Sequence, residues 1–283
     1  DPLDAFEPCE LAEFPPLPFE KEVICAIIFL GCEKMKKNND LQNENQPLTF
    51  ANLFGKSSKL WIYIKGIFTL FLFFFSTYFA YIPIWLFDID PATMSDETSI
   101  WRTFFSNIML VLILFLIYFK SLKKEWQIFR KDGLKNLDIG FKYWMIGLMV
   151  MVVSNIIINF VFVHNIAANE EAVQSMIQVS PWLMLINAGI LAPITEEITF
   201  RKTFKDMIKN PYLFIGISGI FFGFLHVVSA TNFFEFLYII PYAALGISFA
   251  FMYQKTNTVF TSMAMHFFHN TVLTLVSILP IVL

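Results

Sequence analysis

Charged side chains are scarce in this sequence. Asp, Glu, Lys and Arg make up 15% of its 283 residues, whereas soluble domains carry about 25%. Hydrophobic residues reach 57%, with 35 Phe among them, and the mean hydropathy is +0.61. This composition excludes an ordinary soluble domain and indicates a protein whose solvent is largely lipid. The net charge of −3 leaves no basic excess for binding nucleic acid.

Cysteine is equally sparse, with only Cys9, Cys25 and Cys32 before the first long apolar run. An odd number without CxxC spacing excludes a disulfide framework and a zinc ribbon. We interpret the three as reduced thiols on the cytoplasmic side. No alternating pattern of β-strands and no internal repeat is present either, so the long apolar stretches must account for the fold.

Seven long apolar runs predict membrane-spanning helices, because in lipid the backbone must satisfy its own hydrogen bonds. The predicted fold class is therefore all-α, a polytopic helical membrane bundle of about seven to eight transmembrane helices. Residues 1–59 are predicted to form an N-terminal tail, with an interfacial helix at 22–33 that is too short to span. Residues 60–283 form the transmembrane domain. The runs cover residues 60–87, 101–119, 141–163, 181–204, 212–230, 233–253 and 258–282.

The loops between these runs predict the orientation. Loops with excess Lys and Arg stay in the cytoplasm, and here they alternate with acidic loops that hold residues such as Asp88, Glu97 and Glu170. The N-terminus is therefore predicted to be cytoplasmic, in a multi-pass protein of the plasma membrane if the source is prokaryotic. The basic stretches hold Lys120, Lys123, Lys124, Arg130, Lys131 and Lys135, then Arg201, Lys202, Lys205 and Lys209, then Lys255.

Several ionisable residues lie inside the last four apolar runs. A charged side chain at mid-bilayer costs about 2.5–3.5 kcal/mol on insertion scales, so such residues are usually functional. His164 is instead predicted to be a solvated loop residue. The candidates are Glu196, Glu197, His226, Glu235, His266 and His269, accompanied by Asn270.

The fourth run contains two adjacent glutamates after a proline, in the segment 192–201. Pro193 lacks an N–H and is expected to kink the helix before the acids. Glu197 and Arg201 are four residues apart and can pair on one helix face. Glu196 is turned about 100° away and cannot use Arg201 equally well. We interpret this as one neutralised carboxylate and one left for another task, although a helix-end ion pair explains the pattern too.

The fifth and seventh runs place imidazoles on inward faces. Gly219 and Gly223 form a GxxxG pair, which lets a second helix come close, and His226 follows on that face. His266 and Asn270 are four apart and point the same way, with His269 on a neighbouring face as a supporting residue. A buried histidine bonded to a carbonyl, or a polar contact between helices, remains the structural alternative.

Taken together, an acid and two imidazoles with an amide, on three helices, are the parts for water-mediated attack on an amide. At these residues the chain resembles the CAAX protease and bacteriocin-processing family, also called CPBP or Abi. The family motifs EExxxR, FxxxH and HxxxN occur in order as Glu196-Glu197-Ile198-Thr199-Phe200-Arg201, Phe222-Gly223-Phe224-Leu225-His226 and His266-Phe267-Phe268-His269-Asn270. The resemblance covers residues 181–283.

The resemblance implies a glutamate-dependent intramembrane endopeptidase without a metal or another cofactor. It implies that Glu196 and His226 activate water and that His266 and Asn270 form the oxyanion hole. The supporting residues would be Glu197, Arg201 and Phe222. The implied partners are membrane lipid and a peptide or protein substrate, with lipidated substrates among the candidates, and no nucleic acid.

Three other readings stay open at this point. The first is a non-catalytic membrane binding or bacteriocin-immunity protein of the same family. The second is a proton-coupled transporter, although repeated halves are not seen. The third is a zinc peptidase with Glu196, His226 and His266 as ligands, although HExxH is missing.

Overall fold

The structure is a computed structural model that describes residues 59–79, 81–86, 95–163 and 166–283. All of these residues belong to one compact unit, and every regular element among them is a helix. Residues 1–58 of the tail predicted at 1–59, with its helix at 22–33, and the loop residue His164 lie outside the described residues.

The first half of the described chain forms four α-helices and a π-helical turn: α3 (Lys59–Phe79), α4 (Tyr81–Leu86), α5 (Asp96–Lys131), α6 (Gly133–Ile158) and η2 (Asn159–Val163). The hydroxyl of Ser95 caps α5 by accepting from the backbone N–H of Thr98 at 3.2 Å. Acidic residues fill the first turn of α5 and basic residues its last turn, which suits the helix dipole.

The basic stretch after the second apolar run is helical, which corrects its interpretation as a loop. Helix α5 runs for 36 residues to Lys131, and α6 begins at Gly133. The segment between Ser95 and Gly133 contains neither proline nor glycine, and Lys, Arg, Glu and Gln are good helix formers. Polarity alone therefore did not end the helix.

The helix that carries the two glutamates contains two π turns. After α7 (Ala168–Val179), the chain continues through α8 (Pro181–Ile186), η3 (Asn187–Leu191), α9 (Ala192–Glu196), η4 (Glu197–Lys202) and α10 (Thr203–Met207). The first π turn ends two residues before Pro193, which has no N–H for a regular i→i−4 bond. The wider turn accommodates the proline, since the helix continues past it.

The last four helices are α11 (Pro211–Leu225), α12 (Phe233–Phe236), α13 (Ile239–Thr256) and α14 (Val259–Val282). Asn210 caps α11 by accepting from two backbone N–H groups. Asn257 ends α13 in the left-handed conformation, with φ of 54°, a conformation that asparagine tolerates well. The side chain of Thr258 then caps α14.

Five helical stretches of the described chain are long and apolar enough to cross a membrane: Asp96–Lys131, Gly133–Phe162, Pro181–Met207, Phe233–Thr256 and Val259–Ile281. Two shorter apolar helices, Leu60–Ser76 and Pro211–Leu225, accompany them. Large apolar side chains such as Leu116 and Phe160 are about four-fifths exposed, as lipid-facing residues are. The all-helical class is confirmed, with five candidate membrane spans among the described residues, and each predicted run overlaps one of these seven stretches.

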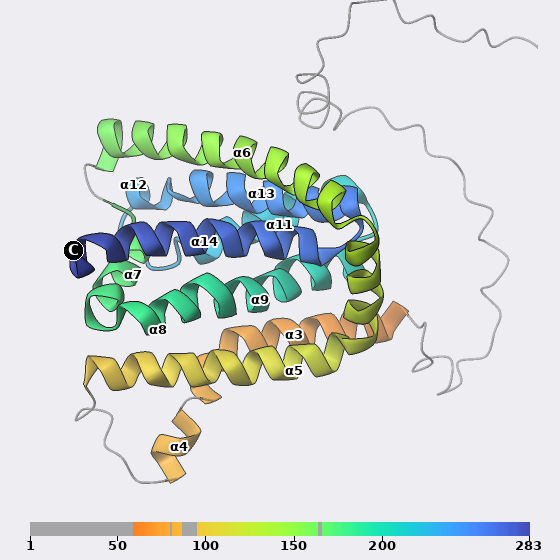
Figure 1. Ribbon diagram of the computed structural model, residues 1–283, viewed down its shortest axis with the longest axis horizontal. Coiled ribbons are helices and arrows are strands. Elements are labelled where there is room, and N and C mark those ends of the chain that lie inside the picture. Colours follow the sequence, from red (N-terminus) through yellow and green to blue (C-terminus); the bar gives the residue numbers. More distant parts are fainter. Residues whose placement is uncertain (1–58, 80, 87–94, 164–165) are drawn as a thin grey trace, which may run out of the picture. The chain divides into compact units, whose positions relative to one another are not determined.

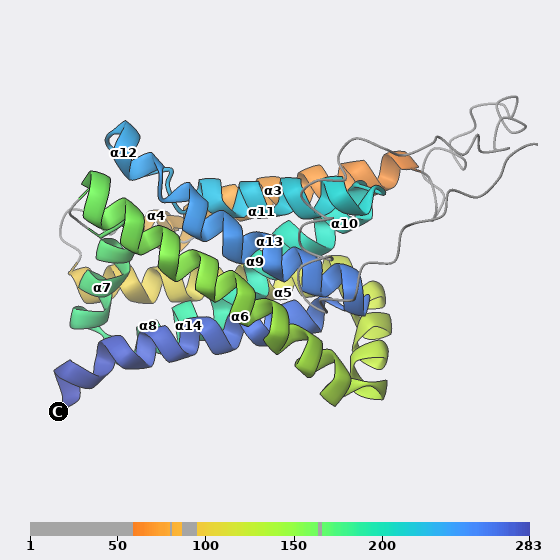
Figure 2. The same cartoon turned by 90° about the horizontal axis from the view of Figure 1, so that it is seen from above.

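Most of the long helices lie side by side along a roughly common direction (Figures 1 and 2), whereas the short helix α4 points away from it in Figure 1. Helix α13 packs between α6 and α11, while α14 packs against α6, α9 and both π turns η3 and η4. The GxxxG pair on α11 is the reason that α13 comes so close. A Cβ added to Gly219 would lie 2.7 Å from the backbone nitrogen of Ile247, and one on Gly223 would lie 2.8 Å from that of Ala243. The predicted inward face is confirmed.

Candidate active site

One cavity of about 190 Å³ is lined by all four residues predicted to be catalytic. Glu196 ends α9, His226 follows the last residue of α11, and His266 and Asn270 lie on α14. Phe222 of α11 lines the same cavity. The tertiary structure therefore brings the acid, the two imidazoles and the amide together from three separate helices.

The two neighbouring glutamates have different surroundings. Glu197 is fully buried, and its Oε1 lies 3.4 Å from Nε of Arg201 and 3.0 Å from Nδ1 of His266. The Glu196 side chain is 17% exposed, and its Oε2 lies 3.8 Å from Nε2 of His266. The ion pair predicted for Glu197 and Arg201 is confirmed. Glu196 faces the cavity without an arginine partner.

A π turn separates these environments, because η4 begins at Glu197, directly after Glu196. The wider turn changes the angle between successive side chains from that of a regular helix, and π turns of this kind are frequent at functional sites. Within η4 every residue from Glu197 to Lys202 is buried. The turn thus holds Glu197 and Arg201 in the protein interior while Glu196, one residue earlier, reaches the cavity.

Arg201 is fully buried and held by aromatic rings as well as by Glu197. Its Cζ lies 4.4 Å from the ring centroid of Phe222 and 5.6 Å from that of Phe249. Such cation–π contacts stabilise a desolvated guanidinium by up to about 2 kcal/mol. Phe222, which sequence reasoning placed in a supporting role, therefore connects the buried ion pair to the cavity that it lines.

His226 is oriented by its own helix and by two rings. Its Nδ1 lies 2.8 Å from the backbone oxygen of Phe222. A carbonyl only accepts hydrogen bonds, so Nδ1 carries the proton and Nε2 of the neutral ring carries a lone pair. The imidazole lies between the ring of Phe222 and that of Tyr242, each with its centroid 4.5 Å away. This arrangement presents a base whose position is fixed by packing.

His266 is held from three sides. Its ring stacks on Phe249 at 4.7 Å and meets the edge of Phe222 at 5.5 Å. Nδ1 donates to the carboxylate of Glu197. The other ring nitrogen, Nε2, faces the carboxylate of Glu196. With one carboxylate near each nitrogen, a protonated ring would have an acceptor on both sides.

Asn270 is anchored to a neighbouring helix. Its Nδ2 donates to the backbone oxygen of Ala188 at 2.9 Å. Ala188 lies within the π turn η3, in which α14 makes a close approach at Gly189, where an added Cβ would lie 2.9 Å from the hydroxyl of Thr271. An amide nitrogen has two hydrogens, so the second remains for a ligand in the cavity that Asn270 lines.

The structure adds residues that sequence reasoning missed. Tyr242 lies on α13 and stacks on His226, and Trp144 of α6 donates through Nε1 to Nδ1 of His269 at 3.3 Å. The sequence offered only a weak signal for them, since an aromatic residue in an apolar run usually faces lipid or core. Asn169 and Glu170, on α7, also line the cavity.

Glu235 is not part of this site, although it was among the ionisable residues of the apolar runs. Its carboxylate accepts from the backbone N–H of Thr231 at 2.8 Å and from the side chain of Asn232 at 2.9 Å. The side chain of Asn232 in turn caps α12. These reciprocal bonds resemble a capping box and give Glu235 a local structural role. Among the described residues, no group of three or more His, Cys, Asp or Glu is placed to hold a metal ion.

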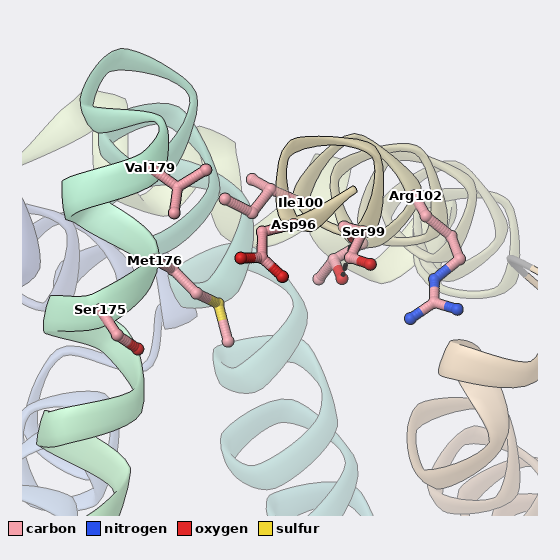
Figure 3. A pocket seen from close by; sticks show the side chains of 8 residues that line it. Asp96, Ser99, Ile100, Arg102, Ser175, Met176 and Val179 are labelled. Atoms are coloured by element: carbon pink, nitrogen blue, oxygen red, sulfur yellow. Dashed lines mark hydrogen bonds between the residues drawn. The ribbon is translucent and has the colours of Figure 1, made fainter. Parts of the chain in front are cut away.

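A second cavity, of about 320 Å³, lies between the start of α5 and the end of α7 (Figure 3). Asp96 and Arg102 line it but extend in different directions in Figure 3, and the guanidinium of Arg102 lies over the ring of Tyr81 at 4.4 Å. None of the predicted site residues lines this cavity, so it is larger than the first but lacks its chemistry.

Comparison with known proteins gives the same family as the motifs. Residues 178–272 match the family model described as type II CAAX prenyl endopeptidase Rce1-like, a segment that contains all three motifs. The Bacillus subtilis protein named "Putative membrane peptidase YdiL" is 32% identical over 116 residues, which are 40% of this chain and 44% of that protein. The aligned segment thus spans less than half of that relative.

The UPF0177 protein YxdF of Lactococcus lactis is 23% identical over 164 residues, or 56% of this chain and 87% of that protein. No solved structure matches the chain significantly. The matched segment includes Glu196, His226 and His266, which line the cavity, and also the buried pair of Glu197 and Arg201. The segment at residues 178–272 is therefore similar to the Rce1-like type II CAAX prenyl endopeptidase family, and it is the segment that carries the three motifs.

Proposed function

We propose that this protein is an intramembrane endopeptidase that hydrolyses a peptide bond with water activated by Glu196 and His226. The observation that supports this most directly is the difference between the adjacent glutamates. Glu197 is fully buried between Arg201 and His266, whereas Glu196 is partly exposed in a cavity with His226. A structural ion pair needs one carboxylate, and the second is left to face the cavity.

In the proposed reaction, Glu196 accepts a proton from a water molecule and the resulting hydroxide attacks the carbonyl carbon. The lone pair on Nε2 of His226, fixed by the bond from Nδ1 to Phe222, holds the same water by accepting its other hydrogen. The tetrahedral intermediate then loses its C–N bond. The proton taken by Glu196 passes to the leaving amine, so the products are a carboxylic acid and an amine.

The oxyanion of that intermediate needs hydrogen-bond donors. Asn270 offers the second hydrogen of Nδ2, since the first is held by the oxygen of Ala188. His266 offers Nε2–H when its ring is protonated, a state in which Glu197 accepts from the other nitrogen. Both residues lie one turn apart on α14 and line the cavity, so a single helix would position both donors.

The cavity walls support a substrate with an apolar or lipidated segment. Besides the polar residues, the lining contains Met151, Val173, Ile177, Leu245 and Leu273. Apolar walls with a few convergent polar groups are the usual construction of a site for a largely apolar ligand. We propose a peptide substrate that enters from the membrane, with a lipidated carboxyl-terminal peptide as the first candidate.

We also propose seven membrane crossings with a cytoplasmic N-terminus, a tail at 1–59 and a catalytic core at 181–283. Helix α11 has 15 residues, or about 22 Å at about 1.5 Å per residue. The hydrocarbon core is about 30 Å thick, so the end of α11, where His226 lies, would remain within the membrane. The alternation of basic and acidic segments between the apolar runs supports this orientation.

The experiment compares the full chain with two matched variants in proteoliposomes. Two quenched fluorescent peptides serve as probes, one ending in a farnesylated CAAX sequence and one with the same sequence without the lipid. Glu196→Gln should lower cleavage by about 10²- to 10⁴-fold, the usual loss when a general base is removed. Glu97→Gln is the control, because Glu97 is exposed in the first turn of α5 and does not line the cavity.

Retained cleavage in Glu196→Gln would refute the assignment of the base. Cleavage that is abolished by a chelator and restored by Zn²⁺ would favour a zinc peptidase. Binding of the peptides without any cleavage by the unaltered chain would favour a non-catalytic immunity or binding protein of the same family.

A further inference from the structure

His269 lines the catalytic cavity but has no role in the proposed reaction so far. It is 4% exposed and shares the cavity with Glu196, His226 and Asn270. It directly precedes Asn270 on α14. A buried imidazole on the wall of a reaction cavity, one residue from a proposed oxyanion donor, needs an explanation beyond packing.

The partner of His269 fixes which ring nitrogen carries the proton. Nε1 of Trp144 lies 3.3 Å from Nδ1 of His269, and both side chains are buried. An indole N–H can only donate, so Nδ1 must accept and cannot be protonated. The proton of the neutral ring is therefore on Nε2. No hydrogen-bond partner for Nε2 is present in the described part of the chain.

Trp144 can impose this tautomer because its own position is fixed. It packs in a buried cluster with Leu245, Phe249, Met252 and Met265. The ring of Phe268 meets it edge-on at 5.1 Å. Close-packed interiors leave little room for rotation, so the indole N–H stays directed at His269.

The cavity consequently holds two neutral imidazoles of opposite character. His226 has its proton on Nδ1, bonded to Phe222, and offers a lone pair on Nε2. His269 has its lone pair on Nδ1, bonded to Trp144, and offers an N–H on Nε2. One is built to accept a hydrogen bond and the other to donate one. A peptide group at a hydrolytic site needs both, a base for water and donors for its carbonyl oxygens.

We propose that Nε2–H of His269 donates a hydrogen bond to a carbonyl oxygen of the bound peptide, with Trp144 as the positioning residue that holds the tautomer. The inference rests on the proposed endopeptidase function. It adds a donor on the wall next to Asn270, contributed by a residue at a variable position of the third motif.

Two substitutions separate this role from a purely structural one. Asparagine places its amide near the position of Nδ1, so His269→Asn keeps an acceptor for Trp144 but offers no donor to the cavity. Glutamine places its amide near the position of Nε2, so His269→Gln keeps the donor and loses the acceptor. We expect His269→Asn to lower kcat/KM for the fluorescent peptide by about tenfold or more, and His269→Gln to retain most of it. A structural role predicts the reverse order.

The tautomers are measured without any substrate. The chain contains four histidines, so each ¹⁵N-histidine signal in detergent micelles is assigned by single substitution. At neutral pH His269 should show a protonated Nε2 and an unprotonated Nδ1, and His226 the opposite pattern. Trp144→Phe, which keeps an aromatic ring but removes the N–H, should give His269 a mixture of both tautomers.

The outcomes distinguish the two proposals. A protonated Nδ1 on His269, or full activity in His269→Asn, would overturn the inference. If the unaltered chain cleaves neither peptide, the endopeptidase function fails, and the tautomer alone decides whether His269 is a donor in this cavity. The expected result is an Nε2–H signal from His269 in the unaltered chain, together with activity that His269→Gln retains and His269→Asn loses.

Discussion

Removal of Arg201 should destabilise the fold through the charge that it leaves behind. The guanidinium and the carboxylate of Glu197 are both fully buried, with 3.4 Å between Nε and Oε1. At an effective dielectric constant of about 20, two unit charges at that distance attract by about 5 kcal/mol. Breaking a buried pair by removing one partner costs about 3–5 kcal/mol. Glu197 keeps its bond to His266 in the variant. We therefore expect Arg201→Met to lower the free energy of unfolding by about 3 kcal/mol, the low end of this range.

The measurement is reversible unfolding by SDS in mixed micelles, followed by the fluorescence of the six tryptophans. Adding Glu197→Gln to Arg201→Met should recover most of the lost free energy of unfolding, since an uncharged pair no longer buries a lone charge. The control is Lys142→Met, which breaks an exposed pair with Asp138 at the same i,i+4 spacing and should cost less than about 1 kcal/mol.

Equal losses in Arg201→Met and Lys142→Met would refute the reasoning, because burial would then contribute nothing. A double variant as unstable as Arg201→Met alone would do the same, since the loss would have to come from packing against Phe222 rather than from the unpaired charge of Glu197.

Two further predictions concern packing and orientation. Gly223→Val should destabilise the fold in the same unfolding assay by about 1–3 kcal/mol, because its Cβ would lie 2.8 Å from the backbone nitrogen of Ala243. Gly216→Ala is the control, since a Cβ at residue 216 meets nothing within 4 Å, and it should be neutral or stabilising. A cysteine at Glu171 should react with a membrane-impermeant maleimide in intact cells, and one at Lys123 only after permeabilisation; the opposite pattern would contradict the predicted orientation.

The sequence predicted the main features of the bundle for physical reasons. Apolar runs of 19 residues or more must be helical in lipid, and the i,i+4 spacing of Glu197 and Arg201 pairs them on any helix. The glycines at 219 and 223 indicated a close helix contact, which α13 provides. The end of the second helix was predicted from polarity alone, and this prediction was wrong. Helix α5 extends to Lys131 through the basic stretch that was interpreted as a loop.

Spacing along the chain determined which residues share a helix face, because that depends only on local geometry. Their place inside apolar runs, together with the three motifs, identified Glu196, His226, His266 and Asn270 as candidates. Only the tertiary structure showed that they line one cavity and that a π turn begins between Glu196 and Glu197. It also showed that the indole N–H of Trp144 points at Nδ1 of His269, which places the proton of that ring on Nε2. The cavity and the tautomer of His269 depend on contacts between residues far apart in the sequence, such as Trp144 and His269, which are 125 positions apart, and no local pattern encodes such contacts.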